Sequence, residues 1–114
     1  LKNFDKSDPL HYYGSDAIHI KKLIKADPDL GERLHEDLPY LKAEVIWAVR
    51  EEMCRTVEDF LARRSRALLL DARASVAMAP EVAGLIAEEL GYDEDWESVQ
   101  VDDYSQMAGE YLLA

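Results

Sequence analysis

The sequence predicts an all-α fold, a compact bundle of about five to six helices with no significant sheet. Apolar residues recur every three or four positions through most of the 114 residues, which is the spacing of one helical face. Residues that favour helix ends, among them Asp27, Asp71 and Gly91, separate these periodic stretches. No stretch alternates apolar and polar residues strongly enough to place a strand.

The first residues lack helical periodicity. Residues 1–11 read as a linker, and we expect residues 12–114 to form a single domain. A glycine then interrupts the chain, and Ser15 or Asp16 can cap a helix that runs to about Ala26. The apolar residues of this helix share one face, as in an ordinary surface helix.

A short turn and a buried helix come next. Asp27 and Pro28 are a cap and a first helical residue, and Gly31 follows too closely for more than about one turn. Helical spacing resumes over residues 41–53, where Trp47 widens the apolar stripe beyond a single exposed face. We expect this helix to be largely buried.

A near capping box begins the next helix. Thr56 can accept a hydrogen bond from a first-turn amide, and Asp59 can reach back toward the start of the turn. The helix therefore starts at Val57 and turns Phe60 and Leu61 inward.

Leucines and helix ends mark the rest of the chain. Residues 68–70 are three consecutive leucines, and Asp71 offers another cap. Residues 71–78 and 80–90 are expected to be helical, either as two helices or as one helix with a kink at Pro80, and Gly91 fits a left-handed cap. A last helix covers about residues 94–112, where aromatic and apolar residues form a stripe.

The overall charge excludes some partners. A net charge of -11 opposes binding to a phosphate backbone, so we expect no nucleic-acid partner. No apolar run approaches the roughly 20 residues of a membrane-spanning helix, so we expect no direct membrane insertion by this domain. The single Cys54 fits a reducing compartment, and no secretory signal follows Leu1, which favours a cytoplasmic location and an excised fragment.

The densest mixture of charge and apolar residues lies between positions 43 and 75. Glu51 precedes Arg55 by four residues, and Asp59 precedes Arg63 by four, which is the favourable order for intrahelical ion pairs. Arginine forks also suit a phosphate ligand or a domain interface. The candidate ion-pair or domain-interface residues are Arg50, Glu51, Arg55, Asp59, Arg63, Arg64, Arg66, Asp71 and Arg73.

The sequence suggests no catalytic, cofactor-binding or metal site. The histidines lack the i, i+4 spacing of a helical metal site, and Cys54 has acidic neighbours that raise a thiol pKa. The chain has no G-x-G-x-x-G turn between a strand and a helix, so it cannot hold a dinucleotide in the Rossmann manner.

Several motifs in this order resemble the C-terminal helical domain of the FAD-dependent glycerol-3-phosphate dehydrogenases and the related glycerophosphate oxidases. The similarity covers roughly residues 12–92. The motifs are Tyr13-Gly14-Ser15-Asp16, a Leu38-Pro39-Tyr40 turn, Ala43-Glu44-Val45, Ala48-Val49-Arg50-Glu51-Glu52-Met53, Arg55-Thr56-Val57-Glu58-Asp59, Leu61-Ala62-Arg63-Arg64-Ser65-Arg66 and Leu70-Asp71-Ala72-Arg73-Ala74.

The resemblance implies a non-catalytic structural domain that packs on the N-terminal flavin-binding portion of the same chain. It implies that the parent enzyme oxidises glycerol 3-phosphate to dihydroxyacetone phosphate and passes electrons through FAD to quinone, or in a sister branch to oxygen. The parent would be peripheral on the cytoplasmic membrane, and a homo-oligomer is compatible with the resemblance. FAD belongs to the parent and no cofactor belongs to this fragment.

A second hypothesis is a stand-alone helical interaction module without a redox role. An excised domain should expose an apolar patch where its partner sat, and residues 68–70 together with Trp47 are the expected patch. Direct binding of a phosphorylated ligand by the arginines is a third hypothesis, which a ligand-dependent shift in melting temperature would reveal.

Overall fold

A computed structural model describes residues 16–65 and 67–113. The predicted linker over residues 1–11, the proposed cap at Ser15 and the candidate residue Arg66 lie outside this part of the chain. The start of the domain at residue 12 stays a prediction.

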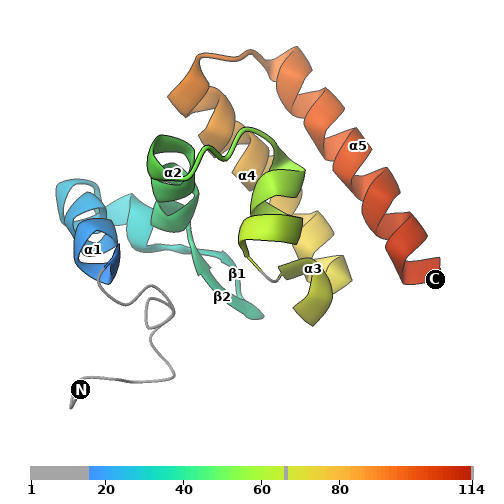
Figure 1. The fold of residues 1–114 in the computed structure, drawn as a ribbon, viewed down its shortest axis with the longest axis horizontal. Helices are drawn as coiled ribbons and strands as arrows, with labels where there is room; N and C mark the ends of the chain where they lie inside the picture. Colours follow the sequence, from blue (N-terminus) through green and yellow to red (C-terminus); the bar gives the residue numbers. More distant parts are fainter. Residues whose placement is uncertain (1–15, 66, 114) are drawn as a thin grey trace.

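The described chain is mainly helical, as predicted (Figure 1). Its elements are α1 (Asp16–Ala26), the 3-10 turn η2 (Pro28–Gly31), β1 (Arg33–His35), β2 (Leu38–Leu41), α2 (Lys42–Glu51), the π-helical turn η3 (Asp59–Arg64), α3 (Ala67–Leu70), α4 (Ala72–Leu90) and α5 (Glu94–Leu113).

The first connection agrees with the sequence. The Asp27 carboxylate accepts a hydrogen bond from the Asp29 N–H at 3.2 Å, and Pro28 begins the short η2 turn. This is the expected capped turn after α1, because proline fits the first helical position, where no amide donor is needed.

A small antiparallel hairpin was not predicted. β1 and β2 form a two-stranded sheet, in which His35 pairs with Leu38 and Arg33 pairs with Leu41. The interpretation of residues 38–40 as a turn is therefore wrong, because they lie within β2. Pro39 is compatible with a strand here, since each strand of a two-stranded sheet has an unpaired edge. The short strands and their irregular register left no alternating pattern to detect.

The helix α2 is buried on most sides, as expected. Six of its residues are buried, including the polar Glu44, whose carboxylate accepts the backbone N–H of Leu41 at 2.5 Å. This bond closes the first turn of α2, which follows β2 without a loop.

The helix α4 runs through Pro80 and ends where predicted. The Asp71 carboxylate accepts the Ala74 N–H at 3.0 Å at its start, and Gly91 has φ 76 at its end. Glycine reaches this left-handed conformation without the steric cost of a Cβ. α5 then folds back along α4, and the two helices form a hairpin (Figure 1).

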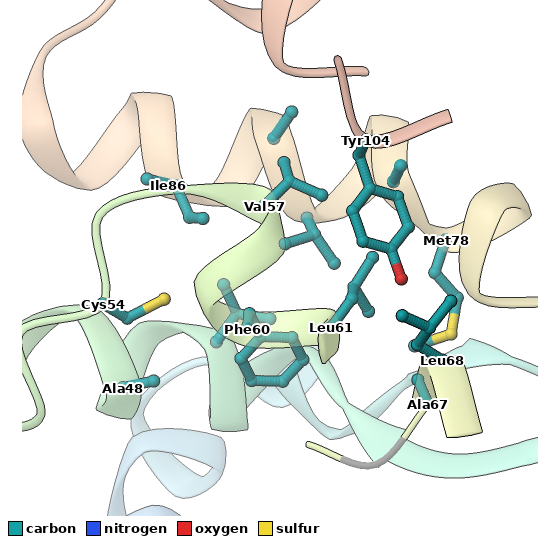
Figure 2. Close-up of a cluster of buried hydrophobic side chains, with 14 of the residues drawn as sticks. Ala48, Cys54, Val57, Phe60, Leu61, Ala67, Leu68, Met78, Ile86 and Tyr104 are labelled. Carbon is teal, nitrogen blue, oxygen red and sulfur yellow. The ribbon is translucent and has the colours of Figure 1, made fainter. Parts of the chain in front are cut away.

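The main core lies between α2, η3, α4 and α5. Figure 2 shows Phe60, Leu61 and Val57 of the η3 region in one cluster with Met78 and Ile86 of α4. A smaller cluster joins α1 to α2 through Ile20, Leu41 and Ala43. Tyr104 and Ala108 of α5 are also buried, whereas Val99 is 55% exposed.

Candidate functional site

The most charged segment forms the junction between α2 and η3. We define the junction as residues 52–59 together with the side chains from other elements that form hydrogen bonds with them. α2 ends at Glu51, and Met53 takes φ 59, a left-handed conformation that reverses the chain direction. The Glu52 and Cys54 N–H groups both donate to the Ala48 carbonyl, at 2.9 and 3.1 Å. The end of α2 is thus closed by its own following residues.

The side chain of Arg55 also caps the C-terminal end of α2. Its guanidinium donates to the carbonyl oxygens of Val49 at 2.9 Å and Cys54 at 2.8 Å. A cation at the C-terminus of a helix also interacts favourably with the helix dipole. The predicted i, i+4 pair between Glu51 and Arg55 is wrong, because α2 stops before Arg55 and redirects its side chain onto the carbonyls.

Thr56 and Asp59 form the predicted capping box. The Thr56 hydroxyl accepts the Asp59 N–H at 3.0 Å, and the Asp59 carboxylate accepts the N–H groups of Thr56 at 3.1 Å and Arg55 at 3.0 Å. The amides at the start of the new helix would otherwise lack partners in a partly buried turn. One carboxylate therefore orders both the turn and the helix start.

A residue from α5 completes the junction. The side-chain oxygen of Gln100 accepts the Val57 N–H at 3.1 Å, across 43 residues of sequence. Sequence reasoning missed this contact, because glutamine on a helix carries no signal of which backbone amide it reaches.

The turn after the junction is wider than an α-helical turn. The Ser65 N–H donates to the Phe60 carbonyl at 2.7 Å, five residues back, as in a π-helix. Phe60 and Leu61 are fully buried, while the exposed Arg63 and the half-buried Arg64 line a shallow depression of about 280 Å³.

Acidic partners surround these two arginines. Arg63 lies 3.5 Å from Asp59 and 3.2 Å from Glu58, and Arg64 pairs closely with Glu52. The charge of the depression is therefore largely balanced within the domain. This arrangement favours a structural role for the arginines over the binding of a phosphorylated ligand.

Arg50 forms a tertiary contact that the sequence did not reveal. Its guanidinium holds Glu89 of α4 through two hydrogen bonds, at 2.6 and 3.2 Å. The bond to Glu89 raises the pKa of Arg50 above its ordinary value. This bidentate pair joins the outer ends of α2 and α4.

The remaining candidates lie at the start of α4. Asp71 is used as the α4 cap, and Arg73 is exposed two residues later. The structure thus brings Arg55, Asp59 and Arg63 together at the junction and places Arg73 in a different part of the molecule.

Cys54 has the properties of a core residue. It is 4% exposed, and burial raises the pKa of its thiol to about 11, with Asp59 adding to the shift. The thiolate is the reactive form of cysteine, so this thiol is poorly suited to nucleophilic chemistry near neutral pH.

A buried hydrogen bond on the other side of the core was also missed. The hydroxyls of Ser75 and Tyr104 lie 2.9 Å apart, and burial raises the pKa of Tyr104. Ser75 also donates to the Ala72 carbonyl at 2.8 Å, which leaves the Tyr104 hydroxyl as the donor between them. This bond fixes α5 against the first turn of α4.

Together these contacts define a class of protein. It is a mainly helical domain in which clustered charged residues close helix ends and join helices. No group of three or more His, Cys, Asp or Glu side chains among residues 16–65 and 67–113 is placed to hold a metal ion.

The chain belongs to the family of C-terminal domains of alpha-glycerophosphate oxidase. The family model matches residues 6–97, which includes the junction and most of the helical core. Gln100 and Tyr104 lie beyond the matched range.

Curated relatives support the same family. The chain is 35% identical over 94 residues to a probable mitochondrial glycerol-3-phosphate dehydrogenase of Caenorhabditis elegans, a match that covers 79% of this chain and 13% of the relative. It is 33% identical over 102 residues to a mitochondrial glycerol-3-phosphate dehydrogenase of Arabidopsis thaliana, covering 90% of this chain and 15% of the relative. For the human mitochondrial glycerol-3-phosphate dehydrogenase the identity is 33% over 86 residues, or 72% of this chain and 12% of the relative.

These matches cover only a small part of each relative. The chain spans between 12% and 15% of the length of these three relatives. No solved structure matches the chain. None of the described helices is both long enough and apolar enough to cross a membrane.

Proposed function

We propose that this chain is the C-terminal structural domain of an FAD-dependent glycerol-3-phosphate dehydrogenase, and that the whole protein oxidises glycerol 3-phosphate to dihydroxyacetone phosphate. The observation that carries the proposal is the family match over residues 6–97, joined by relatives named as glycerol-3-phosphate dehydrogenases. Those relatives are much longer than this chain, so the chemistry is assigned to the rest of the polypeptide.

The geometry of the described residues supports a structural role for the domain itself. Arg55 and Asp59 close backbone groups, while Arg50 and Arg64 pair with glutamates. Charged side chains that bond to backbone groups or pair with glutamates inside the domain stabilise the domain itself. Of the candidate residues, these are assigned to internal stabilisation, and Arg73 is assigned to an interface.

The cofactor and partners follow from the same proposal. The described residues do not fit FAD, because the chain lacks a glycine-rich phosphate loop, so the flavin belongs to the N-terminal portion of the parent chain. That portion is the proposed partner of this domain. The parent passes electrons to quinone, is peripheral on the cytoplasmic membrane, and is compatible with homo-oligomerisation.

Purification of the full-length protein that carries this domain tests the proposal. We expect a bound flavin with visible absorbance and glycerol 3-phosphate-dependent reduction of a quinone analogue. The matched control substrate is glycerol, which lacks the phosphate and should give no reduction. The 114-residue chain alone should give neither absorbance nor reduction.

A full-length protein without flavin and without glycerol 3-phosphate oxidation would contradict the proposal. A start codon close to Leu1 would favour the stand-alone interaction module instead.

A further inference from the structure

The helix α3 lies at the rim of the domain (Figure 1). Two neighbouring leucines of this helix are exposed. Ala67 and Leu68 are buried, at 0% and 8% exposure, and hold α3 against the core. Leu69 and Leu70 are each 61% exposed. Among residues 17–65 and 67–110, whose side-chain burial the structure describes, they are the only consecutive pair of large apolar residues that are both exposed. The expected patch therefore contains neither Leu68, which is buried, nor Trp47, which stacks on His19 in the smaller core cluster.

Two of the other exposed apolar side chains, Tyr92 and Met53, have contacts that account for them, whereas Ile18 and Val99 are exposed singly. The ring of Tyr92 packs at 4.7 Å from that of Trp96. The sulfur of Met53 accepts a hydrogen bond from Arg55 at 3.7 Å, within the junction. Single exposed apolar residues are common on protein surfaces, but adjacent ones form a continuous patch.

Arg73 adds a positive charge three residues after Leu70 in the sequence. It is exposed and has no ion-pair partner within the described chain, in contrast to Arg50 and Arg63. It also occupies the first turn of α4, where the helix dipole disfavours a cation. Stability of α4 therefore does not explain the choice of arginine at this position.

We propose that Leu69, Leu70 and Arg73 form the surface that docks this domain onto the flavin-bearing portion of the same polypeptide. The leucines enter an apolar site there, and Arg73 faces a carboxylate. This inference rests on the proposed function, which places most of the polypeptide outside this chain, consistent with a span of 12% to 15% of three relatives.

Charge argues against a second copy of this chain as the occupant. A domain with a net charge of -11 repels its own copies, whereas two exposed leucines followed by one exposed arginine match a mainly apolar partner with a carboxylate. The flavin-bearing portion is also tethered to this domain, so its effective concentration is high and a small patch is sufficient.

Cysteine protection tests the docking surface. Leu69→Cys is introduced into both the full-length protein and the 114-residue chain, and alkylation of residue 69 by iodoacetamide is followed by peptide mass spectrometry. Cys54 gives a slow internal reference, because it is buried and its pKa is about 11. We expect residue 69 to react about 10-fold more slowly in the full-length protein, since an interface core excludes solvent.

The matched control is Val99→Cys, at a position that is 55% exposed on α5. Its rate should agree within about 2-fold between the two proteins. Leu70→Cys repeats the test at the neighbouring position. If residues 69 and 70 each react at the same rate in the full-length protein as in the 114-residue chain, the proposed docking surface is refuted.

Two further outcomes are decisive. Protection in the 114-residue chain that increases with protein concentration would assign the patch to a second copy and overturn the proposed occupant. Arg73→Glu in the full-length Leu69→Cys protein should raise the alkylation rate about 3-fold, and an unchanged rate would remove Arg73 from the surface.

The same preparations separate this inference from the proposed function. Glycerol 3-phosphate-dependent dye reduction with no protection at residues 69 and 70 would refute the docking surface alone. Protection without any such reduction would refute the dehydrogenase assignment and leave the docking surface supported.

Discussion

The junction and the rim at α3 use similar residues in opposite ways. Both combine arginine with apolar residues near a helix start. At the junction, Arg55 and Asp59 bond to neighbouring backbone groups, and Phe60 is fully buried. At the rim, Leu69 and Arg73 face solvent. The difference shows that a segment with many charged residues need not mark an interface. Its charged side chains can instead form hydrogen bonds and ion pairs within the domain.

The largest expected effect comes from breaking the junction. Asp59→Ala removes the acceptor for the N–H groups of Arg55 and Thr56 and a partner of Arg63. We expect the free energy of unfolding to fall by about 2 to 4 kcal/mol, from the lost cap and the unsatisfied amides. Urea denaturation measures this change. Glu58→Ala, which removes only a surface pair with Arg63, should cost under about 1 kcal/mol. Equal losses for the two variants would refute a special role for Asp59.

Alkaline pH should weaken the core beside the junction. Burial raises the pKa of Cys54 from 9.0 to about 11, so between these values the unfolded thiol ionises while the folded thiol stays neutral. The stabilisation is complete below pH 9 and is lost as pH rises, by about 2 to 3 kcal/mol at pH 11. Chemical denaturation of wild type and Cys54→Ala between pH 8 and 11 should give a steeper decline for wild type. Parallel declines would mean that Cys54 does not contribute.

Arg55→Lys tests whether the junction needs a forked donor. The Nη1 nitrogen of Arg55 donates to both the Val49 and Cys54 carbonyls while Nη2 donates to the Met53 sulfur, and a single ammonium group does not supply both nitrogens in this planar arrangement. We expect a loss of about 1 to 2 kcal/mol in unfolding free energy, seen as a lower urea midpoint. Arg73→Lys at the rim is the control and should have no measurable effect. A fully stable Arg55→Lys protein would show that charge alone closes α2.

The smallest effect is expected at the rim. Leu69→Ser together with Leu70→Ser should change the unfolding free energy of the 114-residue chain by no more than about 0.5 kcal/mol, because these side chains are mostly exposed. Leu68→Ser, in the same short helix but buried, should cost more than about 2 kcal/mol. Thermal unfolding followed by circular dichroism compares the three proteins. A large loss for the double variant would mean that the two leucines serve this domain's own core.

Sequence reasoning predicted the helical architecture and most helix ends correctly. The caps at Asp27, Asp71 and Gly91, and the box formed by Thr56 and Asp59, are all present. It failed for the β1–β2 hairpin, whose short strands carry little periodic signal. It also failed for Glu51 and Arg55, because their predicted pairing assumed a helix that continues past residue 51.

The sequence by itself determined the contacts that span only a few residues. Each of these capping residues lies within four positions of the amides that it accepts, so local spacing brings them together in any fold that forms the helix. The tertiary structure alone decided the contacts of Arg50 with Glu89, Val57 with Gln100 and Ser75 with Tyr104, which are 39, 43 and 29 residues apart. Their formation depends on how α2, η3, α4 and α5 pack, and packing also decided that Leu68 is buried while Leu69 and Leu70 remain exposed.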